Sequence, residues 1–210
     1  FIKKMIFGLS HLTFCSNNIS HDLQYFIDCN YKESFNDNVY NHKSKSKFLS
    51  TYKEFHKIYF LKSQTNGPNL ELIDYSNNNS RKSNSYKLIN NNSIMMFSND
   101  YKKDVNFLTN FIGFNKNGNN FTFKRSIPTW NINIKIKENN YKDENLIDDI
   151  GFVALSFLCK NINDLEDKLI SYSCYDILPN YRLSVNKRKL KILIFKLPGG
   201  SFCELIESIK

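Results

Sequence analysis

The sequence predicts an α+β protein in which one βαβββ unit, a strand, a helix and three further strands, occurs twice. Two segments, GLSHLTF (8–14) and GFVALSF (151–157), share Gly, an apolar residue, two intervening residues, Leu, a small hydroxyl residue and Phe. Each is followed by an amphipathic helix pattern, and later by two strand patterns joined at a turn that contains Gly and Pro. This repeated order of elements predicts a duplicated fold.

The first copy contains each of these elements in order. We expect Ser20 to cap a helix at its N-terminus. The apolar face of that helix consists of Leu23, Phe26 and Ile27. FHKIYFLK (55–62) then leads through a Gly-Pro turn into PNLELIDY (68–75), which predicts a β-hairpin. The residues around 36–50 are expected to form a polar loop.

The second copy has the same elements. Asn163 is the expected N-cap of a helix. The apolar positions of this helix are Leu165 and Leu169. KILIFKL (191–197) then runs through Pro-Gly-Gly into SFCELIES (201–208). The last strand of both copies contains Glu-Leu-Ile, so the two units end alike, and we place them at 6–76 and 150–208.

The residues between the two units are less regular. Residues 77–92 are predicted to be a polar linker by composition. Within 93–138, SIMMFS is a strand pattern, 100–114 a helix pattern that ends at Gly113, and two further strand patterns follow. This segment is either a third, degenerate βαβββ unit or an insertion that completes another sheet, and the sequence leaves both interpretations open.

The composition limits the class of protein. The 210 residues are 41% hydrophobic and 15% aromatic, which is enough for one large or two small folded domains. The net charge is +9, but only four of the 29 basic residues are Arg, whereas nucleic-acid sites favour Arg. No apolar run approaches the ~18 residues that cross a bilayer. We therefore expect no nucleic-acid partner and no membrane partner.

The cysteines argue for a reducing compartment. There are five, an odd number, and none has CxxC spacing. This pattern disfavours both a disulfide framework and a cysteine-rich zinc site. We expect a cytoplasmic protein.

Strand alternation places polar side chains from several strands on one face. His11 and Thr13 point to the side opposite Leu12, and Ala154 and Ser156 occupy the equivalent places in the second copy. The last strands add Glu71 and Glu204, and the core face is expected to contain Leu12, Phe14, Leu70, Leu72, Val153, Leu155, Phe157, Cys203 and Leu205. A carboxylate between apolar strand residues is costly unless it is paired or binds a metal. The recurrence of Glu in both copies therefore indicates a site.

These motifs, GLSHLTF with PNLELIDY and GFVALSF with PGGSFCELIES, resemble the vicinal oxygen chelate superfamily. That superfamily includes glyoxalase I, methylmalonyl-CoA epimerase, extradiol dioxygenases, and fosfomycin and bleomycin resistance proteins. The resemblance covers about 8–75 and 151–207. It implies paired βαβββ modules that form a curved, open, mixed sheet around a cavity, and it also implies a homodimer, because the modules often pair between chains.

The resemblance also implies a metal site. The four ligand places of the family fall on His11, Glu71, Ala154 and Glu204. Ala154 cannot bind a metal, which excludes the iron site made of two His and one carboxylate. One imidazole and two carboxylates remain reasonable ligands for a divalent Zn, Ni, Co, Mn or Fe ion. His56 is a candidate fourth ligand, but we expect it to be a surface histidine.

The implied activity is that of a glyoxalase- or epimerase-like lyase or isomerase acting on a small, oxygen-rich substrate. The metal stabilises an enolate-like intermediate, and Glu71 or Glu204 moves a proton as general base and then acid. Thr13 and Ser156 are the candidate substrate-binding hydroxyl groups. The alternative is a metal-free ligand-binding protein of the resistance type, which the loss of a ligand at Ala154 favours.

Two basic segments have solvated loops as their preferred interpretation. NYRLSVNKRKLK (180–191) is expected to link helix and hairpin. Its Arg182 and Arg188 are the residues that could meet an anionic, phosphate- or CoA-type substrate at the cavity mouth. HKSKSK (42–47) carries no competing functional interpretation.

Overall fold

The first βαβββ unit forms in the predicted order. The computed structural model describes residues 5–76, 83–84, 88–90, 93–118, 120–123, 133–138, 145–171 and 176–209. The first unit comprises β1 (Ile6–Ser16), α1 (Ile19–Asp28), β2 (Tyr31–Tyr40), a 3-10 helix (Lys43–Phe48), β3 (Phe55–Ser63) and β4 (Asn69–Asp74). β1 runs parallel to β4, and β4, β3 and β2 are successive antiparallel neighbours. The polar loop expected at 36–50 is wrong, because these residues extend β2 and form the 3-10 helix.

The second unit repeats this arrangement. It comprises β11 (Ile150–Cys159), α3 (Ile162–Ser171), β12 (Tyr181–Val185), β13 (Arg188–Lys196) and β14 (Phe202–Ser208). β11 runs parallel to β14, which is followed by β13 and β12 in antiparallel order. The solvated loop expected at 180–191 is wrong. This segment is the β12–β13 hairpin, whose tight turn is made by Asn186 and Lys187, both with positive φ.

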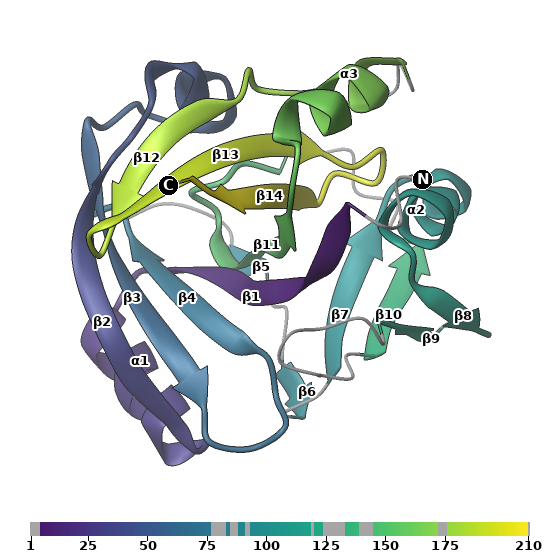
Figure 1. Cartoon of the computed structure of the whole chain (residues 1–210). Helices are drawn as coiled ribbons and strands as arrows, with labels where there is room; N and C mark the ends of the chain where they lie inside the picture. The colour runs from purple at the N-terminus through teal and green to yellow at the C-terminus, as the bar shows by residue number, and fades with distance from the viewer. Residues whose placement is uncertain are drawn as a thin grey trace.

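The two units join into one sheet through β1 and β11, which pair antiparallel. The strand order is β12-β13-β14-β11-β1-β4-β3-β2, with the short β5 (Ser83–Asn84) pairing with β11 off this path. The sheet curls into an open half-barrel, so that its two outer strands approach each other (Figure 1). The backbone N–H of Asn186, after β12, donates to Asp37 Oδ2 on β2 at 2.7 Å. The predicted curved, open, mixed sheet is confirmed.

A second, smaller sheet contains the intervening residues. Its strands are β6 (Leu88–Asn90), β7 (Ser93–Ser98), β8 (Asn115–Asn117), β9 (Asn120–Thr122) and β10 (Asn133–Glu138). Between β7 and β8 the chain forms α2 (Tyr101–Asn106) and a π-helix (Phe107–Ile112). β7 runs parallel to β10, and β9 and β8 follow in antiparallel order, which is the pairing of the two larger units. We therefore propose that 93–138 is a reduced third unit. Much of the predicted linker 77–92 lies outside the described residues.

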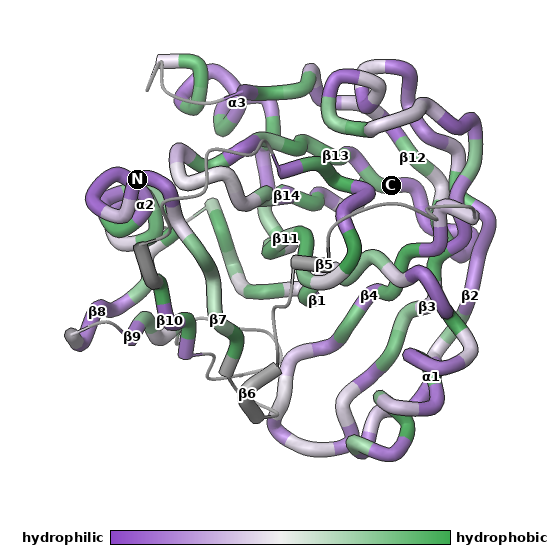
Figure 2. The backbone as a smooth tube through the Cα atoms, turned by 180° about the vertical axis from the view of Figure 1, so that it is seen from behind, coloured by the Kyte–Doolittle hydropathy of each residue, from purple (hydrophilic) through white to green (hydrophobic). Residues whose placement is uncertain are grey.

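The hydrophobic core lies between the main sheet, the helices and the second sheet. Hydrophobic residues concentrate in the central strands, whereas the helices alternate hydrophobic with hydrophilic positions (Figure 2). The predicted core-face residues Leu12, Leu70, Leu155, Phe157 and Leu205 all belong to this cluster. Val153 does not, because the β1–β11 pairing shifts register after Thr13 and turns Val153 toward the opposite face.

The helix starts differ from the expected ones by two residues. The side chain of Asn18, not that of Ser20, caps α1 by accepting from the backbone N–H of His21. Ile27 is 46% exposed, whereas Phe26 is buried. Asn163 lies inside α3, and the Glu207 carboxylate accepts from the first free amides at 161 and 162. A side chain of β14 has thus replaced the local N-cap side chain, which usually accepts from the free backbone N–H groups at the start of a helix. No helix in the described part of the chain is long and apolar enough to span a membrane.

Asp104 of α2 attaches the smaller sheet to the turn between β13 and β14. Its side chain is fully buried, and its Oδ1 accepts from the backbone N–H of Gly199 at 2.9 Å. A Cβ at Gly199 would collide with the side chains of Asp104 and Ser98, so this close approach requires glycine. Burial raises the pKa of Asp104 to about 6, although the Gly199 and Ser98 contacts oppose the shift.

We expect Asp104→Asn to change how stability depends on pH. The folded state holds a proton on Asp104 up to about pH 6, whereas the ordinary pKa of an Asp side chain is 3.8. This contribution is therefore full below pH 3.8 and is lost as pH rises through 6, by roughly 3 kcal/mol in total. Urea unfolding at pH 4 and 7.5 should show this loss in the wild type relative to the variant. The exposed Asp167→Asn serves as control, and identical pH profiles for wild type and Asp104→Asn would contradict the prediction.

Candidate active site

The centre of the candidate site is His11, in the middle of β1. The side chain faces the inside of the half-barrel and is 4% exposed. Its Nδ1 hydrogen-bonds with Ser10 Oγ at 3.0 Å, and its ring meets Phe60 edge-on with centroids 5.3 Å apart. Its Nε2 lies 3.6 Å from Glu71 Oε2 and 3.7 Å from Glu204 Oε2 and has no hydrogen bond. The imidazole and both carboxylates thus converge, although they are far apart in the sequence.

Both carboxylates are held by the same local device. In the parallel pairing of β1 with β4, Thr13 lies opposite Glu71, and in that of β11 with β14, Ser156 lies opposite Glu204. Thr13 Oγ1 donates to Glu71 Oε2 at 3.3 Å, and Ser156 Oγ donates to Glu204 Oε2 at 2.8 Å. The two hydroxyls also lie 3.4 Å apart. Ser156 is fully buried, and its hydrogen bond fixes the orientation of the Glu204 carboxylate.

The same register identifies the residue equivalent to His11. His11 lies two positions before Thr13, and Ala154 lies two positions before Ser156. Ala154 is buried beside Glu204 and lines the same hollow. At these equivalent positions the first unit therefore presents an imidazole and the second only a methyl group.

Two adjoining hollows meet at the glutamates. The first, here the Lys45 hollow, has a volume of about 50 Å³ and is lined by Thr13, Lys45, His56 and both glutamates. The second, here the Arg188 hollow, has a volume of about 210 Å³ and is lined by His11, both glutamates, Lys62 and Arg188. Leu183 and Val185 of β12 line both. Arg182 alternates with these two residues and is exposed, so the structure does not bring it to either hollow.

Comparison with known proteins identifies the fold of the chain through solved structures and not through its sequence. No family model and no curated protein matches the sequence. Methylmalonyl-CoA epimerase from Mycobacterium tuberculosis superposes with a TM-score of 0.50 at 10% identity, over 98% of this chain and 91% of that chain. The chain has the vicinal oxygen chelate fold.

Two further similar structures cover larger proteins. Glyoxalase I from Zea mays gives a TM-score of 0.40 at 12% identity, over 97% of this chain and 68% of that chain. A proposed dioxygenase from Bacillus subtilis gives 0.42 at 10% identity, and this chain covers 64% of its length. At 10% identity, the superposition on the epimerase shows the fold and no activity.

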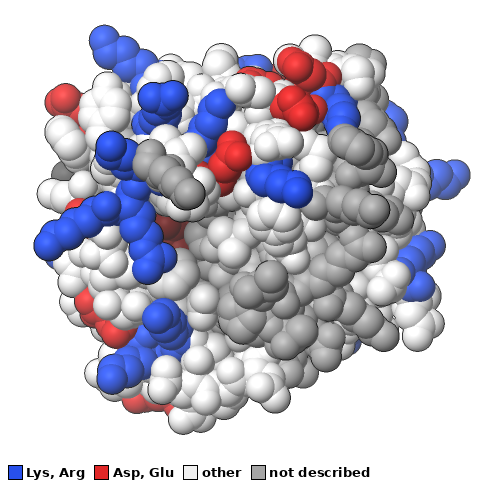
Figure 3. Space-filling view, in the orientation of Figure 1, with Lys and Arg blue, Asp and Glu red and all other residues white. Residues whose placement is uncertain are grey.

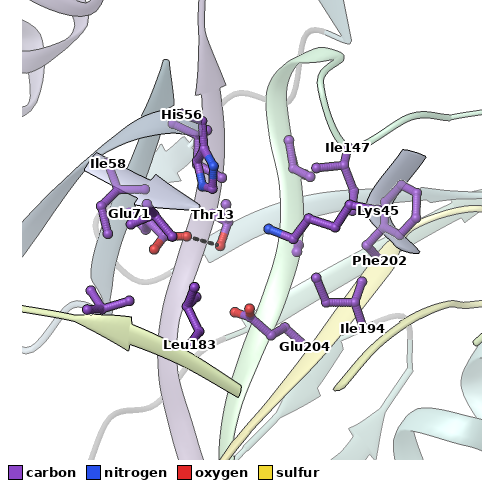
Figure 4. Close-up of a pocket in the computed structure, with 15 residues that line it drawn as sticks. Thr13, Lys45, His56, Ile58, Glu71, Ile147, Leu183, Ile194, Phe202 and Glu204 are labelled. Carbon is purple, nitrogen blue, oxygen red and sulfur yellow. Dashed lines mark hydrogen bonds between the residues drawn. The ribbon is translucent and has the colours of Figure 1, made fainter. Parts of the chain in front are cut away.

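Within this vicinal oxygen chelate fold, Lys45 is a site residue that the sequence did not indicate. It was expected in a solvated charge run, but it is 6% exposed and its ammonium enters the Lys45 hollow between Glu71 and Glu204 (Figure 4). The 3-10 helix turns it inward, because Phe48 packs on Phe202 and the His42 ring stacks on Tyr181. In the sequence, the only sign that Lys45 faces inward is the apolar Phe48 three residues later, because residues three apart lie on the same side of a 3-10 helix.

His56 is the second correction. We expected a surface histidine, but the ring is 5% exposed, lines the Lys45 hollow and stacks on Tyr75 with centroids 5.1 Å apart. The alternation of side chains along β3 explains this burial. His56 lies between exposed Phe55 and Lys57 and shares its face with Ile58. Burial, with a smaller effect of Lys45, lowers the pKa of His56 to about 3.

The pKa shifts of the two glutamates have opposite signs. Burial alone would raise the pKa of Glu71, but His11, with smaller effects of His56 and Lys45, outweighs burial and lowers it. Burial and the charge of Glu71 together raise the pKa of Glu204, against the opposing effects of His11 and Lys45. The pKa of His11 is raised because the glutamates outweigh the effect of its burial. These directions follow from placing two carboxylates around one imidazole in a shielded space.

His56 should make the folded protein sensitive to acid. Its folded pKa, about 3, lies below the ordinary value of 6.5, so its contribution to stability is full above pH 6.5 and is lost as pH falls toward 3. The loss amounts to up to ~5 kcal/mol. His56→Phe, which keeps a ring against Tyr75, should flatten the unfolding free energy between pH 7 and 4. The exposed His21→Phe is the matched control, and an unchanged slope in His56→Phe would refute this role.

Proposed function

We propose that the cavity carries out proton transfer at a carbon next to a carbonyl group, the chemistry of a glyoxalase- or epimerase-like lyase or isomerase. The observation that supports this most directly is the buried His11 Nε2, without a hydrogen bond, between two carboxylate oxygens at 3.6 and 3.7 Å. Ionisable groups that converge in a buried hollow with shifted pKa values are typical of acid–base sites.

The roles follow from what each side chain touches. Glu71 and Glu204 line both hollows, so either can reach a substrate proton. Thr13 and Ser156 each donate to one of the carboxylates and hold it in place. The imidazole of His11, fixed by Ser10, lies within reach of both carboxylates. A pair of carboxylates allows one to hold charge while the other takes and returns a proton.

A divalent metal fits this set by type of donor. Within the described ranges, no group of three or more His, Cys, Asp and Glu side chains forms a ready metal site. The spacings of 3.6 and 3.7 Å nevertheless exceed a hydrogen bond and approach the separation of two atoms that share one cation. His11, Glu71 and Glu204 would hold the ion, which would act as a Lewis acid on a substrate oxygen.

A second candidate function is metal-free binding of a small molecule. Two observations favour it: Ala154 replaces a fourth donor, and the Lys45 ammonium already places a positive charge beside both carboxylates. A cation of the protein at this place opposes the entry of a metal ion by simple charge repulsion.

Metal content separates these two functions. We expect purified protein, equilibrated with Zn²⁺ or Mn²⁺ and then desalted, to retain about one ion per chain by mass spectrometry of the metal. His11→Ala and Glu204→Gln should each weaken binding by more than about tenfold, because each removes a donor of a three-donor site. His21→Ala, on the surface, is the control. Equal and negligible content in all four proteins would favour the metal-free function.

Proton transfer has its own test. The wild type should speed the exchange of C–H for C–D in hydroxyacetone and in pyruvate in D2O, followed by NMR. Glu71→Gln and Glu204→Gln should lower this rate about 100-fold or more, the usual effect of losing a general base. Glu54→Gln, at an exposed position, should not. If the wild type leaves both probes at the buffer rate, or if both Gln variants retain the wild-type rate, proton transfer is excluded for this class of carbonyl compound.

A further inference from the structure

The Lys45 ammonium is a charged group of the cavity to which the proton-transfer function assigns no role. Its hollow is also lined by Glu71, Glu204 and His56, the ionisable groups of the site. Among the described residues the ammonium forms neither a hydrogen bond nor an ion pair, and it lies 6.0 Å from the centroid of the Tyr181 ring. That distance is at the outer limit of a cation–π interaction.

The ammonium offers donors that no group of the described residues accepts. Its nitrogen is not one of the fully enclosed polar atoms of this part of the chain, so its three N–H donors open into the hollow, where solvent or a ligand meets them. Burial lowers the pKa of Lys45, while Glu204 and Glu71 act in the opposite direction from a distance. The fold nevertheless fixes this side chain inward through the packing of the 3-10 helix. An acceptor that comes with a ligand would satisfy these donors.

The surroundings of the cavity favour a negatively charged ligand. Lys62 and Arg188 line the Arg188 hollow, which adjoins the Lys45 hollow at the two glutamates. Lys and Arg side chains gather on the left of the space-filling view, over β2 and the β12–β13 hairpin, around a recess in which acidic atoms are visible (Figure 3). Basic groups at a mouth with a cation inside attract and orient small anions.

We propose that Lys45 binds the carboxylate of a small 2-oxo or 2-hydroxy acid, with the carbon to be deprotonated facing the glutamates. Lys45 is thus a substrate-binding residue that sets the substrate class of this site. The inference rests on the proposed function only in taking the cavity as a substrate site. No covalent step is involved, because an ammonium binds a carboxylate through charge-assisted hydrogen bonds.

The geometry explains why a cation of the protein is useful here. Two carboxylates in the same hollow would repel an anionic substrate, and a positive group within the hollow offsets that repulsion. Lys45 reaches the hollow from the 3-10 helix, and Ala154, which also lines this hollow, provides only a methyl group. The ammonium and the carboxylates therefore present opposite charges to the two ends of one small molecule.

The test compares pyruvate with pyruvamide, which has the same carbonyl and methyl groups but no charge. Dissociation constants are measured by NMR titration with EDTA-treated and with metal-equilibrated protein. We expect the wild type to bind pyruvate at least tenfold more tightly than pyruvamide in one or both states. Lys45→Met, of similar length and uncharged, should reduce this preference to less than threefold. Lys43→Met, exposed on the same 3-10 helix, should retain it.

Each other outcome overturns the proposal. Equal affinities in the wild type, or no binding of either probe at 20 mM, would exclude carboxylate recognition, and this comparison needs no variant to fold. A preference that survives in Lys45→Met and disappears in Arg188→Met would place anion binding at the mouth instead. The two proposals fail separately. A Lys45-dependent preference without C–H exchange would remove only the proton-transfer function, and exchange of hydroxyacetone without any preference for pyruvate would remove only the role of Lys45.

Discussion

The antiparallel pairing of β1 with β11 is the constraint on which the rest of the structure depends. It places two parallel strand pairs, β1–β4 and β11–β14, side by side in one sheet. Each pair carries one Glu beside a hydroxyl residue, so joining them brings Glu71 and Glu204 to opposite sides of His11. A shift of one residue in this register would point His11 toward the core and remove it from the site, because successive side chains of a strand face opposite sides of the sheet.

Curling of the sheet makes this cluster a cavity. The β12–β13 turn reaches Asp37 on β2, and Lys47 pairs with Asp176 at 2.6 Å, so the two units meet again across the open side. Leu183 and Val185 of β12 then line both hollows together with the glutamates. Shielded charges interact more strongly than exposed ones, which explains why His11 lowers the pKa of Glu71 while the charge of Glu71 helps to raise that of Glu204.

The charges within the cavity compensate one another. Two carboxylates, a histidine with a raised pKa and a lysine share a small volume, while His56 stays neutral because burial lowers its pKa. An isolated buried charge would be strongly unfavourable, whereas a set of opposite charges is tolerated. The same balance leaves room for two chemistries, since a metal ion and an anionic substrate both interact with this group of charges.

The sequence alone determined the repeated βαβββ order, the core faces of β4 and β14, and the convergence of His11, Glu71 and Glu204, because period-two alternation and duplication are local patterns. It did not place Lys45 or His56, and it placed Arg182 at a mouth from which β12 turns it away. His56 follows the alternation of β3, which the sequence interpretation did not apply to it. The position of Lys45 depends on the packing of Phe48 against Phe202 and the stacking of His42 on Tyr181, and that of Arg182 on the pairing of β12 in its hairpin. The two ring contacts join residues more than 100 positions apart, and only the folded chain decides them.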